Sequence, residues 1–192
     1  MARPRSFNDD DIRAKLLLSF WETGFEGTAL PDLEAATGMS RKSLYNAFGD
    51  KRDMFMRALV DFRGTVLDHT LTPLQSDNAS IEAIGAVLSG LVDFAVTEKG
   101  RAGCMICNTS REAIRHDPAV KSEIDTYFQE IEERFLIVVR EGQAKGEIKD
   151  EPPEELAALC LGAVVSISVL CKAGQPEAML RSIAAGTIAA LS

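Results

Sequence analysis

Apolar residues recur at intervals of three and four along almost the whole chain, and no stretch alternates strictly between apolar and polar residues. That spacing places the apolar side chains on one side of an α-helix, whereas a half-buried strand requires alternation. Capping residues, glycines and prolines divide the 192 residues into nine expected helices. They are expected over residues 8–24, 28–37, 40–48, 50–66, 81–95 and 104–115, from residue 117 to Gly142 or Gly146, and from residues 152 and 176 onward. The pattern predicts an all-α fold.

The charge balance differs between the two parts of the chain. The whole sequence has 21 lysines and arginines against 29 aspartates and glutamates, a net charge of −8. Residues 1–63 contain ten side chains of each sign, whereas residues 64–192 contain eleven basic and nineteen acidic ones. Such a balance argues against a protein covered in positive charge for nucleic acid or anionic lipid. Any nucleic-acid-binding surface must therefore be local and N-terminal.

The longest apolar run covers residues 156–171 and is sixteen residues long. A membrane-spanning helix needs about 20 apolar residues, and charged residues flank this run on both sides. We therefore expect a buried helix and no contact with a membrane. The sequence also begins without the apolar stretch of a secretory signal. A cytoplasmic protein with four reduced cysteines is expected.

Residues 24–59 predict a helix-turn-helix, because a short helix, a turn at Gly38 and a second short helix follow one another. Leu44 and Phe48 lie four residues apart on the second helix and can bury together against the first helices. Lys51 adds charge at the start of the next helix, where free N–H groups can hold a phosphate. The outward face then carries side chains suited to base edges and phosphates, namely Arg41, Lys42, Ser43, Tyr45 and Asn46.

These residues also allow a purely structural interpretation. Helix-turn-helix shapes occur as simple packing in all-helical proteins. Tyr45 could be a surface aromatic that closes a small domain, and Lys51 could be a solvated charge at a helix end.

The segment GFEGTALPDLEAATGMSRKSLYNAFGDKRDMFMRAL resembles the TetR/AcrR family of bacterial transcriptional regulators, above all in G-M-S-x-x-S-L-Y-x-x-F-x-x-K. The resemblance implies a nine-helix homodimer with a DNA-binding domain over residues 1–51 and a ligand-binding and dimerisation domain over residues 52–192. Two features depart from the family pattern: Pro31, Asp32 and Glu34 in the first short helix, and Asn46-Ala47 after the tyrosine. The resemblance assigns DNA contacts to Thr28, Arg41, Lys42, Ser43, Tyr45 and Lys51.

The last two expected helices are rich in small residues, which let helix axes approach closely. Two such helices from each of two chains would form a bundle and hide the run 156–171. A two-fold dimer would place two recognition helices about 34–36 Å apart, one turn of a palindromic DNA site. The alternative is that the first of these helices belongs entirely to the core of one chain. The small residues are Ala157, Ala158, Gly162, Ala163, Ser166 and Ser168, and then Ala184, Ala185, Gly186, Ala189 and Ala190.

The middle helices offer a pocket for a small-molecule ligand of unknown identity, lined by apolar side chains with a few polar ones. Each candidate could equally be plain core. A ligand that fits one tilt of the long fourth helix would change the spacing of the recognition helices. Trp21, in the expected DNA-binding unit, is then a poor reporter of that ligand. The lining candidates are Phe62, Phe94, Met105, Asn108 and Phe128.

Cys104 and Cys107 form a C-x-x-C pair at the expected start of a helix, where the dipole favours a thiolate. A redox or electrophile sensor is conceivable, because Cys107 could resolve an oxidised Cys104. Inert buried thiols are the alternative for this pair. The chain has two histidines and lacks phosphate-loop, zinc-protease and nucleophile-elbow motifs, so we expect no enzyme, metal or cofactor.

The sequence thus favours a dimeric DNA-binding repressor that a small molecule releases from a palindromic operator. The alternatives are a dithiol redox protein or thiol-based sensor that uses Cys104 and Cys107, and a structural dimer with no role on DNA.

Overall fold

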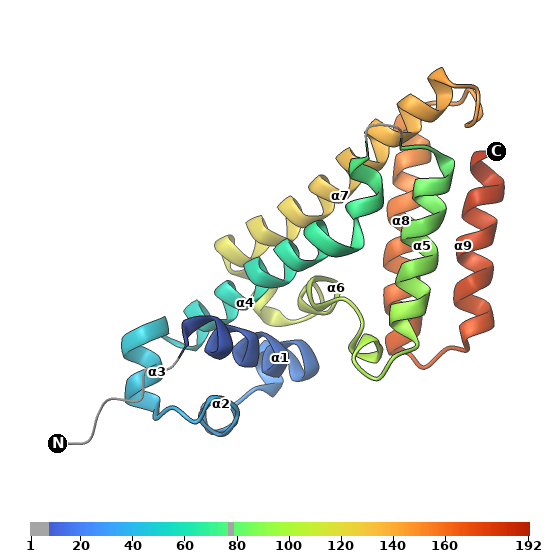
Figure 1. Cartoon of the computed structure of the whole chain (residues 1–192). Coiled ribbons are helices and arrows are strands. Elements are labelled where there is room, and N and C mark those ends of the chain that lie inside the picture. Colours follow the sequence, from blue (N-terminus) through green and yellow to red (C-terminus); the bar gives the residue numbers. More distant parts are fainter. Residues whose placement is uncertain (1–7, 77–78) are drawn as a thin grey trace.

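The computed structural model describes residues 8–76 and 79–192, and all regular structure within these two ranges is helical (Figure 1). The expected all-α fold is therefore confirmed for this part of the chain. Its α-helices are α1 (Asp9–Gly27), α2 (Leu30–Thr37), α3 (Arg41–Phe48), α4 (Lys51–Thr65), α5 (Ile81–Ala95), α6 (Met105–Thr109), α7 (Pro118–Ala144), α8 (Pro153–Lys172) and α9 (Glu177–Leu191). Residues 1–7, at the start of the expected DNA-binding domain, and residues 77–78 lie outside the described residues.

Local side chains set most of these helix boundaries as the sequence predicts. Asn8 caps α1, and Ser40 caps α3 by accepting a hydrogen bond from the Ser43 N–H. Gly24 breaks the helical conformation inside α1, with φ of 77°, where the sequence places the end of the first helix. Gly38 ends α2 in the left-handed conformation.

Several helix boundaries differ in detail from the sequence prediction. The N-cap of α2 is Ala29, directly after Thr28, near which the cap is expected, and the Asp32 carboxylate accepts the Ala29 N–H at 2.7 Å. Helix α4 ends at Thr65, and one π-helical turn over Val66–Thr70 continues it.

The largest difference is in α6, which has five residues instead of the expected twelve. The hydroxyl groups of Thr109 and Ser110 bond to backbone carbonyls of α6 itself, and such local bonds offer the backbone an alternative to a continued helix. A 3-10 turn over Ala113–His116 follows and leads into α7.

The helices form two connected parts (Figure 1). Helices α1, α2 and α3 gather around the start of α4, and a pair of buried aromatic rings, Phe20 and Phe55, joins α1 to α4 at 5.2 Å. Helices α5, α8 and α9 lie side by side, and α7 packs against α8 and α4. Helix α6 lies between the two parts and contacts α1, α4 and α8. One continuous set of buried side chains runs through both parts.

Helix α8 contains the long apolar run and is long and apolar enough, by length and composition alone, to cross a membrane. In the fold it packs against α5, α7 and α9, and 44% of its most apolar window is buried. Leu159 and Val169 point outward with 41% of each side chain exposed. The run is therefore core on one face and surface on the other.

Candidate functional site

Helix α3 presents one buried face and one exposed face. Leu44 and Phe48 are buried, with exposed fractions of 0% and 4%, and they hold α3 against α2 and α4. The spacing of four therefore sets the orientation of the helix as the sequence predicts. All five side chains of the expected contact face are exposed: Arg41, Lys42, Ser43, Tyr45 and Asn46.

The acidic residues of α2 serve the local structure of the helix-turn-helix. Asp32 holds the Ala29 N–H at the start of α2. Glu34 accepts the Arg41 N–H at 2.7 Å, and its other oxygen lies 4.0 Å from the Arg41 guanidinium. Glu34 therefore fixes the start of α3 and leaves the Arg41 side chain more than half exposed.

Thr28 and Lys51 are placed differently from the α3 residues. The Thr28 side chain is 1% exposed, because its hydroxyl donates to the Gly24 carbonyl at 2.6 Å and lies beside Thr23. In this conformation Thr28 closes the end of α1 and offers no side-chain surface to a ligand. Lys51 is half-buried, with its ammonium group 4.3 Å from the centre of the Phe25 ring, a cation–π contact.

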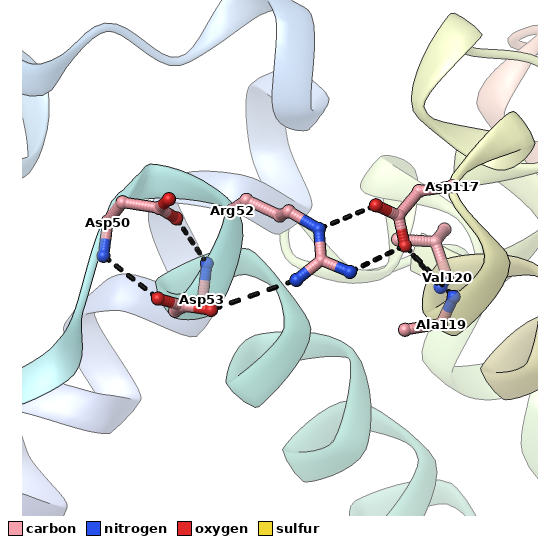
Figure 2. A network of polar contacts seen from close by, with 6 residues as sticks. All are labelled: Asp50, Arg52, Asp53, Asp117, Ala119 and Val120. Carbon is pink, nitrogen blue, oxygen red and sulfur yellow. Dashed lines mark hydrogen bonds and ion pairs between the residues drawn. The ribbon is translucent and has the colours of Figure 1, made fainter.

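Helices α1, α2 and α3 and the start of α4 form the N-terminal unit. An ion pair joins this unit to the rest of the molecule (Figure 2). Arg52, at the start of α4, donates to both oxygens of Asp117 at 2.5 and 2.7 Å. Asp117 also caps α7 through the Ala119 and Val120 N–H groups, while Asp50 and Asp53 cap α4 reciprocally. The Arg52 guanidinium is the main reason that the pKa of Asp117 falls to about 2. The contact therefore ties the first turns of α4 and α7 together.

Two further contacts join the same parts. The Glu26 N–H donates to the Glu112 carboxylate, and the Ala113 N–H donates to the Glu26 carboxylate, each at 2.9 Å. The Trp21 indole N–H donates to the Gly103 carbonyl at 2.7 Å. The segment from Gly103 to Asp117 is thus bonded to both α1 and α4.

Replacing Asp117 with Asn is expected to remove the ion pair but to preserve the helix cap, because Asn is also a favoured N-cap. The pKa of Asp117 is lower in the folded protein than its ordinary value of 3.8. The stabilisation is therefore fully present above about pH 4 and is lost as the pH falls towards 2. The free energy of unfolding of the natural protein should exceed that of the variant at pH 7, and this difference should shrink from pH 4 downward.

The matched control for this prediction is Asp125→Asn, since Asp125 pairs only with the exposed Lys121 on the same helix. Exposed pairs of this type contribute about 0–1 kcal/mol. If the free energies of unfolding of the natural protein and Asp117→Asn differ by the same amount at pH 3 and pH 7, the assigned role of Asp117 is contradicted. Chemical denaturation at a series of pH values measures both variants.

A cavity of about 250 Å³ lies between the N-terminal unit and the C-terminal helices. Its walls are mainly apolar and come from α1, α4, α5, α7 and α8 together with residues 66–71 and 100–104. Three of its lining residues, Thr65, His69 and Phe94, are exposed at the surface. The polar groups of the interior wall include Cys104, Tyr127 and Ser168.

The structure places two of the five sequence-predicted lining residues at this cavity and three elsewhere. Phe62 and Phe94 line it. Met105 is 2% exposed in the core, Asn108 donates to the Ala102 carbonyl at 3.0 Å, and Phe128 packs against Tyr127 without reaching the cavity. The periodicity identifies the apolar face of each helix but not the neighbour that lies opposite.

Trp21 is the main residue that sequence reasoning missed. It lines the cavity and lies 5.2 Å from the Phe62 ring and 6.1 Å from the Phe94 ring. The reason given for expecting Trp21 to be a poor reporter, its distance from the ligand cavity, is therefore wrong. A usable signal was its spacing of four from Leu17, which also lines the cavity. Trp21 belongs to α1, so the N-terminal unit forms part of the cavity wall.

Cys104 and Cys107 are both buried, each with 7% of its surface exposed. Cys104 is the N-cap of α6, and its sulfur accepts the Cys107 N–H at 3.4 Å and lies 3.4 Å from the Tyr127 hydroxyl. Burial raises the pKa of Cys104, but bonds from the Cys107 thiol, Tyr127 and the backbone outweigh burial and lower that pKa to about 7. The pKa of Cys107 is raised by its bond to Cys104 and by burial.

The chain is similar over nearly its whole length to known bacterial regulators. The family model for bacterial regulatory proteins of the tetR family matches residues 17–58, and the model for the tetracyclin repressor-like C-terminal domain matches residues 80–185. YezE of Bacillus subtilis, an uncharacterised HTH-type transcriptional regulator, is 27% identical over 79% of this chain and 78% of its own length. The transcriptional repressor ComR of Escherichia coli is 24% identical over 97% of this chain and 90% of its own length.

The fold also matches solved structures. The TetR-family regulator CifR, solved as a cysteine mutant with a 26-base-pair double-strand operator DNA, is 26% identical and superposes with a TM-score of 0.87. The match covers 99% of this chain and 100% of that one. The helix-turn-helix and the exposed polar face of α3 point to the same kind of protein as these matches. This chain belongs to the tetR family of bacterial regulatory proteins and is a DNA-binding transcriptional regulator.

Proposed function

We propose that this protein is a homodimeric repressor that binds a palindromic operator and leaves it when a small molecule occupies the cavity. The observation that carries the proposal is the exposed polar face of α3 above its buried Leu44 and Phe48. The relatives ComR and BdcR of Escherichia coli are named as transcriptional repressors. Such a regulator acts in the cytoplasm, where the DNA is, and catalyses no reaction.

The proposed DNA contacts come from α3 and the start of α4. Arg41 can pair with a guanine edge, Asn46 with an adenine edge, and Lys42 with phosphate. Ser43 and Tyr45 are exposed on the same face and can bond to phosphates, and Lys51 lies at the N-terminus of α4. Residues 1–51 would then bind DNA, and residues 52–192 would bind the ligand and the partner chain.

The proposed dimer interface is the outer face of α8 and α9. Leu159, Val169 and Met179 are 41–43% exposed there, which is a large apolar exposure for helices of an otherwise well-packed protein. A side chain added at Gly162 or Gly186 would meet nothing within 4 Å in this chain. Exposed small residues of this kind let the helices of a second copy approach closely.

Coupling between ligand and DNA would run through contacts shared by the two parts. Trp21 of α1 and Phe62 of α4 both line the cavity. A ligand that separates or tilts these helices changes the position of α3 and hence the distance between the two recognition helices of the dimer. Couplings of this type are typically about 1–3 kcal/mol.

Selection of DNA from a library of random duplexes tests this function, because the operator need not be identified beforehand. The expected product is an inverted repeat whose half-sites lie about one helical turn apart. Affinity for this duplex should fall with salt, with a log–log slope of about −0.9 for each phosphate contact. Recovery of no shared sequence, or of a single unrepeated half-site by a monomer, would contradict the proposal.

The alternative function for the C-x-x-C pair divides into two cases. A dithiol redox protein must bring a thiol to the disulfide of another macromolecule, and both thiols here are 7% exposed. A thiol-based sensor needs access for small molecules only, which the cavity at Cys104 supplies. The geometry therefore favours a sensor over a dithiol redox protein.

A further inference from the structure

Two of the four cysteines line the cavity, and their hydrogen bonds differ in direction. Cys171 donates its thiol proton to the Ala95 carbonyl at 3.0 Å, an arrangement that needs the protonated thiol. The pKa of Cys171 is raised by burial. The Cys104 sulfur instead accepts the Cys107 N–H at 3.4 Å, and it lies 3.4 Å from the Tyr127 hydroxyl, which can donate to a Cys104 thiolate. Of these two cysteines, Cys104 is therefore the one whose surroundings can stabilise a thiolate.

The Tyr127 hydroxyl can donate a hydrogen bond to a Cys104 thiolate, because it keeps its own proton. It is 3% exposed, and burial together with the charge of the neighbouring Cys104 raises its pKa well above the ordinary value. The phenol therefore remains protonated at neutral pH. The pKa of the Cys107 thiol is raised, so this thiol also remains protonated beside Cys104. Cys104 is the nucleophile of the group, and its two neighbours are positioning residues.

The cavity limits which molecules can reach Cys104. An apolar protein cavity of about 150 Å³ takes a benzene molecule, so a cavity of about 250 Å³ accommodates one ring with substituents or a small bicyclic system. The interior walls are mainly apolar, and the lining residues Phe94 and His69 are exposed at the surface. An anion that entered the cavity would lose its hydration, and the lining residues include no buried cation to compensate for that loss. The cavity therefore favours uncharged molecules.

We propose that Cys104 is a covalent attachment site for small, uncharged, apolar activated alkenes, such as enones and quinones. The Cys104 sulfur bonds to the β-carbon, the carbon–carbon π bond breaks, and the α-carbon takes up one proton in place of the proton that the thiol released. The net step adds S and H across the double bond, with no external oxidant or reductant.

An adduct at Cys104 would act on the contacts that connect the cavity to the DNA-binding unit. Its neighbour Gly103 accepts the indole N–H of Trp21, and Trp21 also lines the cavity. A ring attached to Cys104 competes with Trp21 for the same space. This regulatory consequence rests on the proposed function, whereas the attachment site does not.

N-ethylmaleimide is a suitable probe, because it is an uncharged activated alkene of the size that the cavity holds. The native, full-length protein is treated with the probe at pH 5.5 to 9, and the adducts are followed by intact-protein and peptide mass spectrometry. We expect the first adduct at Cys104, with a rate that rises around pH 7 in accordance with its pKa of about 7. 4-Maleimidobutyric acid has the same reactive group with a carboxylate, and it should react at least about tenfold more slowly because its charge must be desolvated.

Matched variants separate the site from general thiol reactivity. Cys104→Ser should fold, since serine is a better N-cap for α6, and should lose the first adduct. Cys171→Ser removes the other cavity cysteine, and this variant should still form the first adduct at Cys104. Tyr127→Phe removes one donor and should raise the midpoint of the rate profile by about one unit, which lowers the rate at pH 6.5 roughly eightfold. A first adduct at another cysteine, or equal rates for both maleimides at Cys104, overturns the proposal.

The DNA measurement distinguishes failure of this site from failure of the proposed function. The singly modified protein should bind the selected duplex about 5- to 150-fold more weakly, and the probe should have no effect on Cys104→Ser. If the adduct forms and affinity is unchanged, the attachment site stands and ligand-induced release is overturned. If unmodified protein binds DNA but Cys104 does not react, the attachment site is overturned and the proposed function stands.

Discussion

Replacement of Arg41 by alanine is expected to weaken binding to the selected operator duplex by about 1–3 kcal/mol, or about 5- to 150-fold. Arg41 is more than half exposed on the polar face of α3. Its backbone N–H, not its side chain, makes the bond to Glu34 at 2.7 Å, so truncation should leave the start of α3 in place. Fluorescence anisotropy with a labelled duplex measures the loss, and thermal unfolding checks that the fold is kept.

Two further variants show what Arg41 contributes. Arg41→Lys keeps the charge but loses the planar guanidinium fork. If Arg41 reads a guanine edge, this variant should also lose affinity for the duplex. If Arg41 contacts a phosphate, its affinity should remain near normal. Arg140→Ala is the matched control, because Arg140 is exposed near the C-terminal end of α7, and that end of α7 lies away from α3 (Figure 1). Unchanged affinity in Arg41→Ala at low salt would remove Arg41 from the DNA-binding surface.

Replacement of Phe55 by alanine should reduce the free energy of unfolding by about 3–5 kcal/mol, because it leaves a large cavity in a packed core. Phe55 is 0% exposed and lies between two other rings, with Phe20 at 5.2 Å and Phe25 at 5.1 Å. These contacts hold α1 on α4, and α4 in turn supports α3. The variant is therefore also expected to lose operator binding at temperatures where the natural protein binds.

Urea denaturation at fixed protein concentration measures this change, since the stability of a dimer depends on concentration. Val60→Ala is the control on the same helix, because Val60 is 42% exposed and surface changes usually remain within about 0.5 kcal/mol. Equal stability of Phe55→Ala and Val60→Ala would show that the aromatic group does not hold the N-terminal unit together.

The part of the site that sequence could predict is the part that depends on neighbours in the chain. The spacing of Leu44 and Phe48 determines which side of α3 is buried, and Ser40 and Gly49 determine where that helix begins and ends. The placement of Thr28 could not be predicted this way. Its hydroxyl bonds to the carbonyl of Gly24, at a break in α1 next to which the carboxylate of the distant Glu112 accepts the N–H of Glu26.

The cavity shows what only the tertiary structure decided. Trp21, Cys104 and Ser168 come from three separate regions of the chain and meet at one wall. Sequence spacing identified Cys104 as a reactive candidate, but its hydrogen-bond partner Tyr127 lies 23 positions away and meets it only because the fold brings α7 to the start of α6. Helical periodicity reports which side of a helix is apolar because that depends on residues one turn apart. The depth, size and chemistry of a cavity depend on which helices face one another, and packing of the whole chain sets that arrangement.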